Sequence, residues 1–137
     1  MSEEIIEGIV KVKRKDVILL LEAGYLFMEL GKNKEAEDVF NGVVALCPRS
    51  EVPQMALGHL YFSMGRFSAA LKAHQKAIHL NPDSAACHAS VAETLLFLHK
   101  PADALKAIDK AIALDADGSA GQLARSLKEA HELGVFG

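Results

Sequence analysis

Six histidines and two cysteines are the residues of this chain best suited to bind a metal ion or to act as bases and nucleophiles. His74 and His79 fall on one expected helix, but a spacing of five residues turns their side chains about 140° apart, which prevents them from sharing a metal ion. Cys47 and Cys87 belong to no C-x-x-C pair and to no zinc-ligand spacing. We therefore expect no metal site and no disulfide framework.

Residue arrangements that support catalysis are also missing. Cys87 and His88 are adjacent, so they point to different faces of a helix, and no Asp or Asn is placed to complete a nucleophilic set. Glu22 and Glu29 lie two helical turns apart, too far to act as paired carboxylates. No glycine-rich phosphate loop occurs. The sequence predicts neither an enzyme nor a bound cofactor, and His59 is the one histidine that we retain as a candidate functional group.

Charge and hydropathy argue against two classes of partner. The chain carries 15 basic and 18 acidic residues, a net charge of -3, so no attraction to nucleic acid or to anionic lipid is expected. No apolar run approaches the roughly 18 residues that a membrane span needs, and residues 1–4 are acidic where a secretory signal is basic. With half of its residues hydrophobic, the chain is predicted to fold, and to do so in the cytoplasm.

An internal repeat organises most of the chain. Small and helix-breaking residues recur at a spacing of 34, which relates Gly24 to Gly58, Gly31 to Gly65, Pro48 to Pro82, and Ala36 to Ala70 and Ala104. Residues 70–80 also match residues 104–114 at eight of eleven positions. Each unit has room for two helices with a turn between them. We predict three helical hairpins over residues 17–50, 51–84 and 85–118, the third with His99 and Lys100 at its turn.

The flanking segments need separate predictions. In residues 1–16, Ile and Val residues alternate with charged ones, and we expect a short N-terminal helix interrupted by Gly8. Residues 119–137 begin with an amphipathic pattern that continues to about Leu133. We expect these residues to form a helix that caps the last hairpin and gives it a polar outer surface.

The repeat resembles the tetratricopeptide repeat family, whose unit follows the pattern W-x2-L-G-x2-Y…A-x3-F…P. The pattern falls on Leu20, Ala23, Gly24, Phe27, Gly31, Ala36, Phe40 and Pro48 in the first unit, on Gln54, Leu57, Gly58, Tyr61, Gly65, Ala70, His74 and Pro82 in the second, and on His88, Val91, Ala92, Leu95, His99, Ala104, Ile108 and Ala116 in the third. The resemblance implies an all-α protein, a right-handed α-solenoid in which the first helix of every unit lines a concave groove.

The resemblance makes the lining of that groove the expected partner-binding site. Its residues are mostly apolar: Ile18, Leu21, Tyr25, Met28, Val52, Met55, His59, Phe62, Ala89, Glu93, Leu96 and Phe97. The best-known binding mode of the family, a basic clamp for an acidic peptide tail, needs Lys, Asn and Arg where this chain has Leu21, Tyr25, Met55, Ala56, His59, Ala86 and Ser90. The expected ligand is therefore a protein or peptide with an apolar or amphipathic segment, helical or extended.

Small, acidic proteins of three such repeats with apolar grooves resemble the chaperones of type III secretion, and this resemblance implies that the ligand is a needle or translocator subunit. Two alternatives stay open, because the same apolar residues are also satisfied by the chain's own ends or by a second copy in a homodimer. The first helix is polar only at Glu22 and Glu29. A helix that is apolar nearly all round buries more than one face, so a second contact surface is predicted there.

Overall fold

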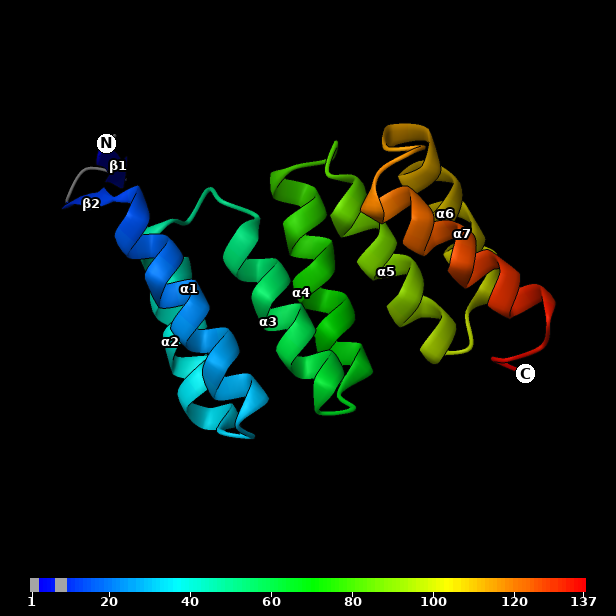
Figure 1. Ribbon diagram of the computed structural model, residues 1–137, viewed down its shortest axis with the longest axis horizontal. Coiled ribbons are helices and arrows are strands. Elements are labelled where there is room, and N and C mark those ends of the chain that lie inside the picture. The colour runs from blue at the N-terminus through cyan, green and yellow to red at the C-terminus, as the bar shows by residue number, and fades with distance from the viewer. Residues whose placement is uncertain (1–2, 7–9) are drawn as a thin grey trace.

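The computed structural model describes residues 3–6 and 10–137 of the chain. Within them, two short strands precede seven helices that run from one end of an elongated molecule to the other (Figure 1). The elements are β1 (Glu3–Ile6), β2 (Val10–Lys13), α1 (Arg14–Glu29), α2 (Asn33–Leu46), α3 (Val52–Ser63), α4 (Phe67–Leu80), α5 (Ala85–Phe97), α6 (Pro101–Leu114) and α7 (Ser119–Glu132). The architecture is an all-helical solenoid of three hairpins with an extra helix after them, as predicted.

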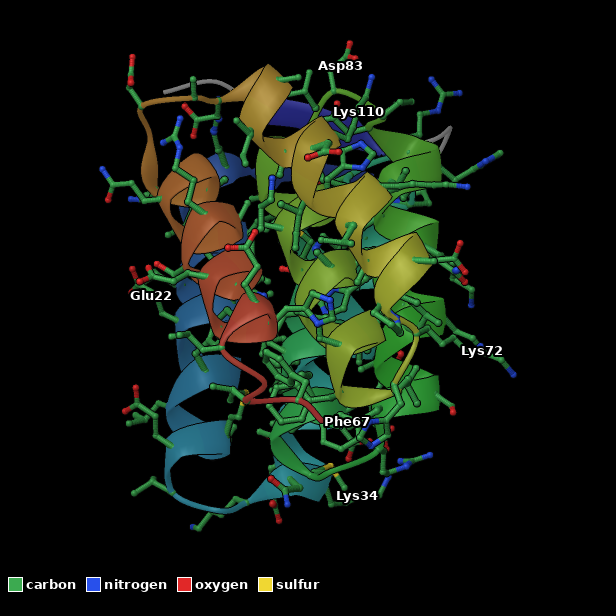
Figure 2. All side chains as sticks on the ribbon, turned by 90° about the vertical axis from the view of Figure 1, so that its right-hand side faces the viewer. Glu22, Lys34, Phe67, Lys72, Asp83 and Lys110 are labelled. Carbon is green, nitrogen blue, oxygen red and sulfur yellow. The ribbon has the colours of Figure 1, made fainter. Side chains whose placement is uncertain are left out.

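Consecutive helices pack as hairpins, α1 with α2, α3 with α4 and α5 with α6, and α7 packs on both α5 and α6. Viewed along the long axis, α1 and α7 lie on one side of the molecule and α4 and α6 on the other (Figure 2). The first helices of the hairpins and α7 thus form one layer, and the second helices form another. No helix of the described residues is long and apolar enough to cross a membrane.

The three hairpin turns share one backbone geometry. Gly31 and Gly65 adopt φ angles of 75° and 73°, a left-handed conformation that glycine reaches without a steric penalty. The following N–H groups close the helix ends, from Lys32 to the Phe27 carbonyl and from Arg66 to the Tyr61 carbonyl. His99 takes the same role in the third turn with a φ of 60°. Histidine is among the residues enriched in this region, so the third turn forms without glycine.

Close packing within each hairpin explains the small residues that repeat every 34 positions. A Cβ added at Gly24 would collide with the Phe40 ring, and one added at Gly58 would collide with the His74 ring. Both rings are fully buried, so they cannot move aside without disturbing the core. In the third hairpin Ala92 occupies the corresponding place, opposite the aliphatic side chain of Ile108.

The prediction of a short N-terminal helix is wrong. Residues 3–6 and 10–13 form an antiparallel pair of strands in which Glu3 lies opposite Lys13 and Ile6 opposite Val10. The β-branched residues of this segment favour strands, and the charged residues between them fit the two-residue period of a strand as well as a helix. Gly8, expected to interrupt the helix, lies outside the described residues. Helix α1 begins at Arg14, inside the segment expected to precede the repeats.

Candidate functional site

The candidate site is the outer surface of α1, α3 and α5, which we call the first-helix face. Side chains that remain at least partly exposed follow each helix in a stripe: Ile18, Leu21, Tyr25 and Met28 on α1, Val52, Met55, His59 and Phe62 on α3, and Ala86, Ser90, Glu93 and Phe97 on α5. Because of the 34-residue repeat, α1 and α3 present equivalent positions, and α5 shares two of them, Ala86 and Glu93. Ten of the twelve residues predicted to bind a partner therefore reach this surface.

Ala89 and Leu96 do not reach it, contrary to the sequence-based expectation. Each is only 1% exposed and belongs to a core cluster with Ala120, Ala124 and Leu127. These three residues come from α7, which packs along α5 and covers the positions that stay open on α1 and α3. Ala86 and Ser90 occupy the open surface of α5 instead. The sequence predicts that the last helix caps the third hairpin, but it does not show that this helix covers Ala89 and Leu96.

A polar row crosses the middle of the first-helix face. It consists of Tyr25, His59 and Glu93, which are equivalent positions in the three repeats. A hydrogen bond of 2.8 Å joins the Tyr25 hydroxyl and His59 Nδ1 and links α1 to α3. Burial raises the pKa of Tyr25 and lowers the pKa of His59, so both side chains are neutral near pH 7. Burial also raises the pKa of Glu93.

His74 lies directly beneath this row, on α4. Its ring is 5.5 Å from the His59 ring between centroids, and it occupies the position that Phe40 and Ile108 hold in the other hairpins. The side chain is 1% exposed, and its Nδ1 has no hydrogen-bond partner among the described residues. Burial, with a smaller contribution from the neighbouring His59, lowers the pKa of His74 to about 4. The repeat pattern places His74 at the position of Phe40 and Ile108, but it does not predict a buried ring whose Nδ1 lacks a hydrogen bond.

The middle of the first-helix face carries only negative charges. Residues 17–30, 52–63 and 85–97 contain Glu22, Glu29 and Glu93 and no Lys or Arg, whereas Arg14 and Lys15 stand in the first turn of α1. Lysines such as Lys72 and Lys110 belong to the second helices, and Figure 2 shows Glu22 and Lys72 projecting from opposite sides of the molecule. The middle of the face therefore lacks the cations that an acidic peptide tail requires.

The two ends of the first-helix face differ in form. Between the starts of α1 and α3, a pocket of about 180 Å³ is lined by Arg14, Val17, Ile18, Leu21, Cys47, Ser50, Val52 and Pro53. At the opposite end, three aromatic rings surround Phe97, namely Phe62, Phe67 and Phe136, at centroid distances of 5.0, 5.1 and 5.4 Å. Phe136 comes from the segment after α7, so the chain's own C-terminal tail covers part of this end.

A second apolar surface lies on the side of α1 that faces away from α3. Leu19, Leu26 and Leu30 are 58%, 55% and 61% exposed, although leucine usually lies in protein interiors. Their side chains point away from Leu21 and Met28, which pack against the core. This surface fits the prediction that α1 has a second contact face.

In the residues that the structure describes, no group of three or more His, Cys, Asp or Glu side chains is placed to hold a metal ion. Cys47 and Cys87 are both buried. Burial raises the pKa of Cys87, which keeps that thiol protonated and unreactive near neutral pH.

Comparison with known proteins identifies the class of fold. The family model for the tetratricopeptide repeat matches residues 54–84, which span most of α3, all of α4 and the following turn. The second hairpin is therefore a tetratricopeptide repeat, and the solenoid as a whole has the fold of tetratricopeptide-repeat proteins. A search of curated protein sequences finds no match.

Several solved structures share this fold over nearly the whole chain. The chaperone SycD of the type III secretion translocator from Yersinia enterocolitica has 18% identity and a TM-score of 0.75, with 85% of this chain and 91% of that chain covered. PcrH, solved with the chaperone binding region of PopB, has 21% identity and a TM-score of 0.74 over 86% and 96%. The first such domain of Spaghetti (RPAP3), bound to an HSP90 peptide, has 21% identity and a TM-score of 0.73 over 88% and 97%. These proteins bind peptides or serve as chaperones, and the likeness to this chain is one of fold.

Proposed function

We propose that this protein is a chaperone or adaptor that holds an apolar segment of a partner protein against its first-helix face and performs no catalysis. The observation that carries the proposal is the continuous set of apolar side chains left partly exposed on α1 and α3. Covering a few hundred Å² of such surface contributes about 25 cal/mol per Å², which can offset the cost of ordering the bound segment.

The finer form of this proposal is a type III secretion chaperone in the cytoplasm. Support comes from the shared fold with SycD and PcrH, from the apolar face and from the missing basic clamp. In this role the protein keeps an assembly-prone segment of a needle or translocator subunit buried until export. Co-expression with the needle and translocator subunits of the same genome tests this form. We expect one of them to become soluble as a stable complex, and insolubility of all of them would contradict it.

A charge placed in the centre of the first-helix face tests the general proposal. Met55 lies partly exposed in the middle of α3. Met55→Glu would therefore place a carboxylate against the apolar ligand, and binding would strip water from that carboxylate at a cost in free energy. We expect the affinity for a peptide selected from a displayed library of 16-residue peptides to fall by at least about tenfold, measured by fluorescence anisotropy. Gln75→Glu, on the exposed side of α4, is the matched control and should bind normally. Unchanged binding by Met55→Glu would refute the assignment of this face.

Self-association is a second candidate function, and the exposed leucines of α1 favour it. Leu19, Ala23, Leu26 and Leu30 follow one another at spacings of four, three and four, which is the spacing of a coiled-coil seam. In an antiparallel pair of α1 helices, these residues of one copy would pack against the same residues of the other. A second copy of the chain thus offers a complementary apolar surface.

Sedimentation velocity tests the seam directly. We expect the wild-type protein to show a concentration-dependent dimer that Leu26→Glu converts to a monomer, because the substitution places two carboxylates in the seam. Leu133→Glu, a change at a 74% exposed leucine beyond α7, should leave the dimer intact. A wild-type protein that stays monomeric at high micromolar concentration would remove this candidate.

A further inference from the structure

Glu93 is an unusual carboxylate because it is partly buried and has no partner. It lies on the open stripe of α5, between Ser90 and Phe97, in the middle of the first-helix face. Among the described residues it makes no hydrogen bond and no ion pair. Burial alone raises its pKa, and no neighbouring cation opposes that effect. The fold thus removes part of the water around this group without replacing it.

Other partly buried carboxylates of this chain accept hydrogen bonds from neighbouring side chains. Glu37 accepts a hydrogen bond from the Tyr61 hydroxyl at 2.7 Å, and Glu51 accepts one from the Asn81 side-chain amide at 3.1 Å. In the polar row itself, Tyr25 and His59 satisfy each other. Glu93 is the member of that row that has no hydrogen-bond or ion-pair partner among the described residues.

The chemistry of a bound segment decides whether the Glu93 carboxylate is destabilised or stabilised by binding. A purely apolar segment laid over the face would exclude the remaining water and leave a carboxylate unpaired, which is strongly unfavourable in a buried site. A Lys or Arg side chain would instead bring both an opposite charge and hydrogen-bond donors. Its aliphatic stem would still contribute apolar contact with the surrounding face.

We propose that the segment held on the first-helix face carries a Lys or Arg that pairs with Glu93, so that the protein selects cationic apolar segments. The inference rests on the proposed function and specifies its ligand. The charge of the middle of the face agrees with it, since Glu22 and Glu29 on α1 add negative charge and the cations of α1, Arg14 and Lys15, lie in its first turn. Glu93 is accordingly a specificity-determining residue, and the first-helix face prefers a positively charged segment to an acidic peptide tail.

Selection from a peptide library tests this inference without a known ligand. Displayed 16-residue peptides rich in Leu, Ala, Phe and Ser, with Lys, Gln and Glu allowed at every position, are selected on the wild-type protein, on Glu93→Gln and on Glu35→Gln. We expect Lys to be enriched at one position of the wild-type binders, and this enrichment to disappear on Glu93→Gln. Glu35→Gln is the matched control, since Glu35 is an exposed carboxylate of α2 that lies outside the first-helix face, and it should retain the enrichment.

Affinity measurements then separate the two levels of the proposal. For one selected peptide, exchange of the enriched Lys for Met should weaken binding to the wild-type protein by about tenfold and binding to Glu93→Gln by less than about twofold. Equal affinities of the two peptides for the wild-type protein would overturn the role of Glu93 and leave the binding face standing. A Lys preference that persists in Glu93→Gln would also overturn it. A library that yields no binder at all would instead refute the proposed function.

Discussion

The Gly58→Ala variant is expected to lose about 3 kcal/mol of unfolding free energy, because its new methyl group would overlap the His74 ring. The ring is fully buried between α3 and α4 and has no free space to enter. The effect should appear as a lower midpoint in urea denaturation with little change in slope. Such a loss is a large share of the 5–15 kcal/mol, roughly, by which a typical domain is stable.

Two further variants make this expectation specific. Gly42→Ala is the control, since a Cβ at Gly42 meets no atom and alanine favours the helix, so a stabilisation of up to about 1 kcal/mol is expected. The double change Gly58→Ala with His74→Ile recreates the Ala92 and Ile108 pair of the third hairpin. It should recover most of the lost stability. Purely additive losses in the double variant would show that the collision with His74 is not the cause.

Acidification is expected to destabilise the protein through His74 by about 3 kcal/mol. The pKa of His74 is about 4 in the folded chain, against about 6.5 in an unfolded one. Below pH 6.5 the unfolded chain therefore binds a proton that the folded chain does not bind, and stability is lost progressively as the pH falls to about 4. Both forms are protonated only below that pH. Its neighbour His59 also has a lowered pKa and acts in the same direction.

Urea denaturation at pH 7 and at pH 4 measures this loss. Carboxylates titrate near pH 4 as well, so the informative quantity is the difference between the wild-type protein and His74→Ile, in which the ionisable ring is absent. We expect the variant to lose about 3 kcal/mol less than the wild-type protein over this range. Parallel losses in the two proteins would mean that His74 takes up its proton without cost.

The repeat architecture could be predicted from the sequence because its signals are local and recur three times. Gly31 and Gly65 mark turns that require a left-handed backbone, and Gly24 and Gly58 mark helices that approach an aromatic or imidazole ring. The third turn lacks its glycine, yet the register of the repeat still placed it at His99. Consistent spacing therefore outweighed the loss of one residue.

The remaining features depend on contacts that a single sequence does not encode locally. The segment before Arg14 is short, and its Ile and Val residues fit a helix or a strand, so pairing between β1 and β2 decides the outcome. The burial of Ala89 and Leu96 follows from how α7 docks on α5. The contact between the Phe136 and Phe97 rings is likewise not predicted by any periodic pattern in the sequence.

If the first-helix face binds a partner as proposed, the contact between Phe136 and Phe97 lowers the affinity for long ligands. A short segment seated between α1 and α3 leaves that end of the molecule undisturbed. A longer one that extends along α5 reaches the same ring and must evict the tail. Its binding free energy is then reduced by the cost of local unfolding at the C-terminal end. The tail thus acts as an internal competitor, and affinity should rise with ligand length only until the two meet.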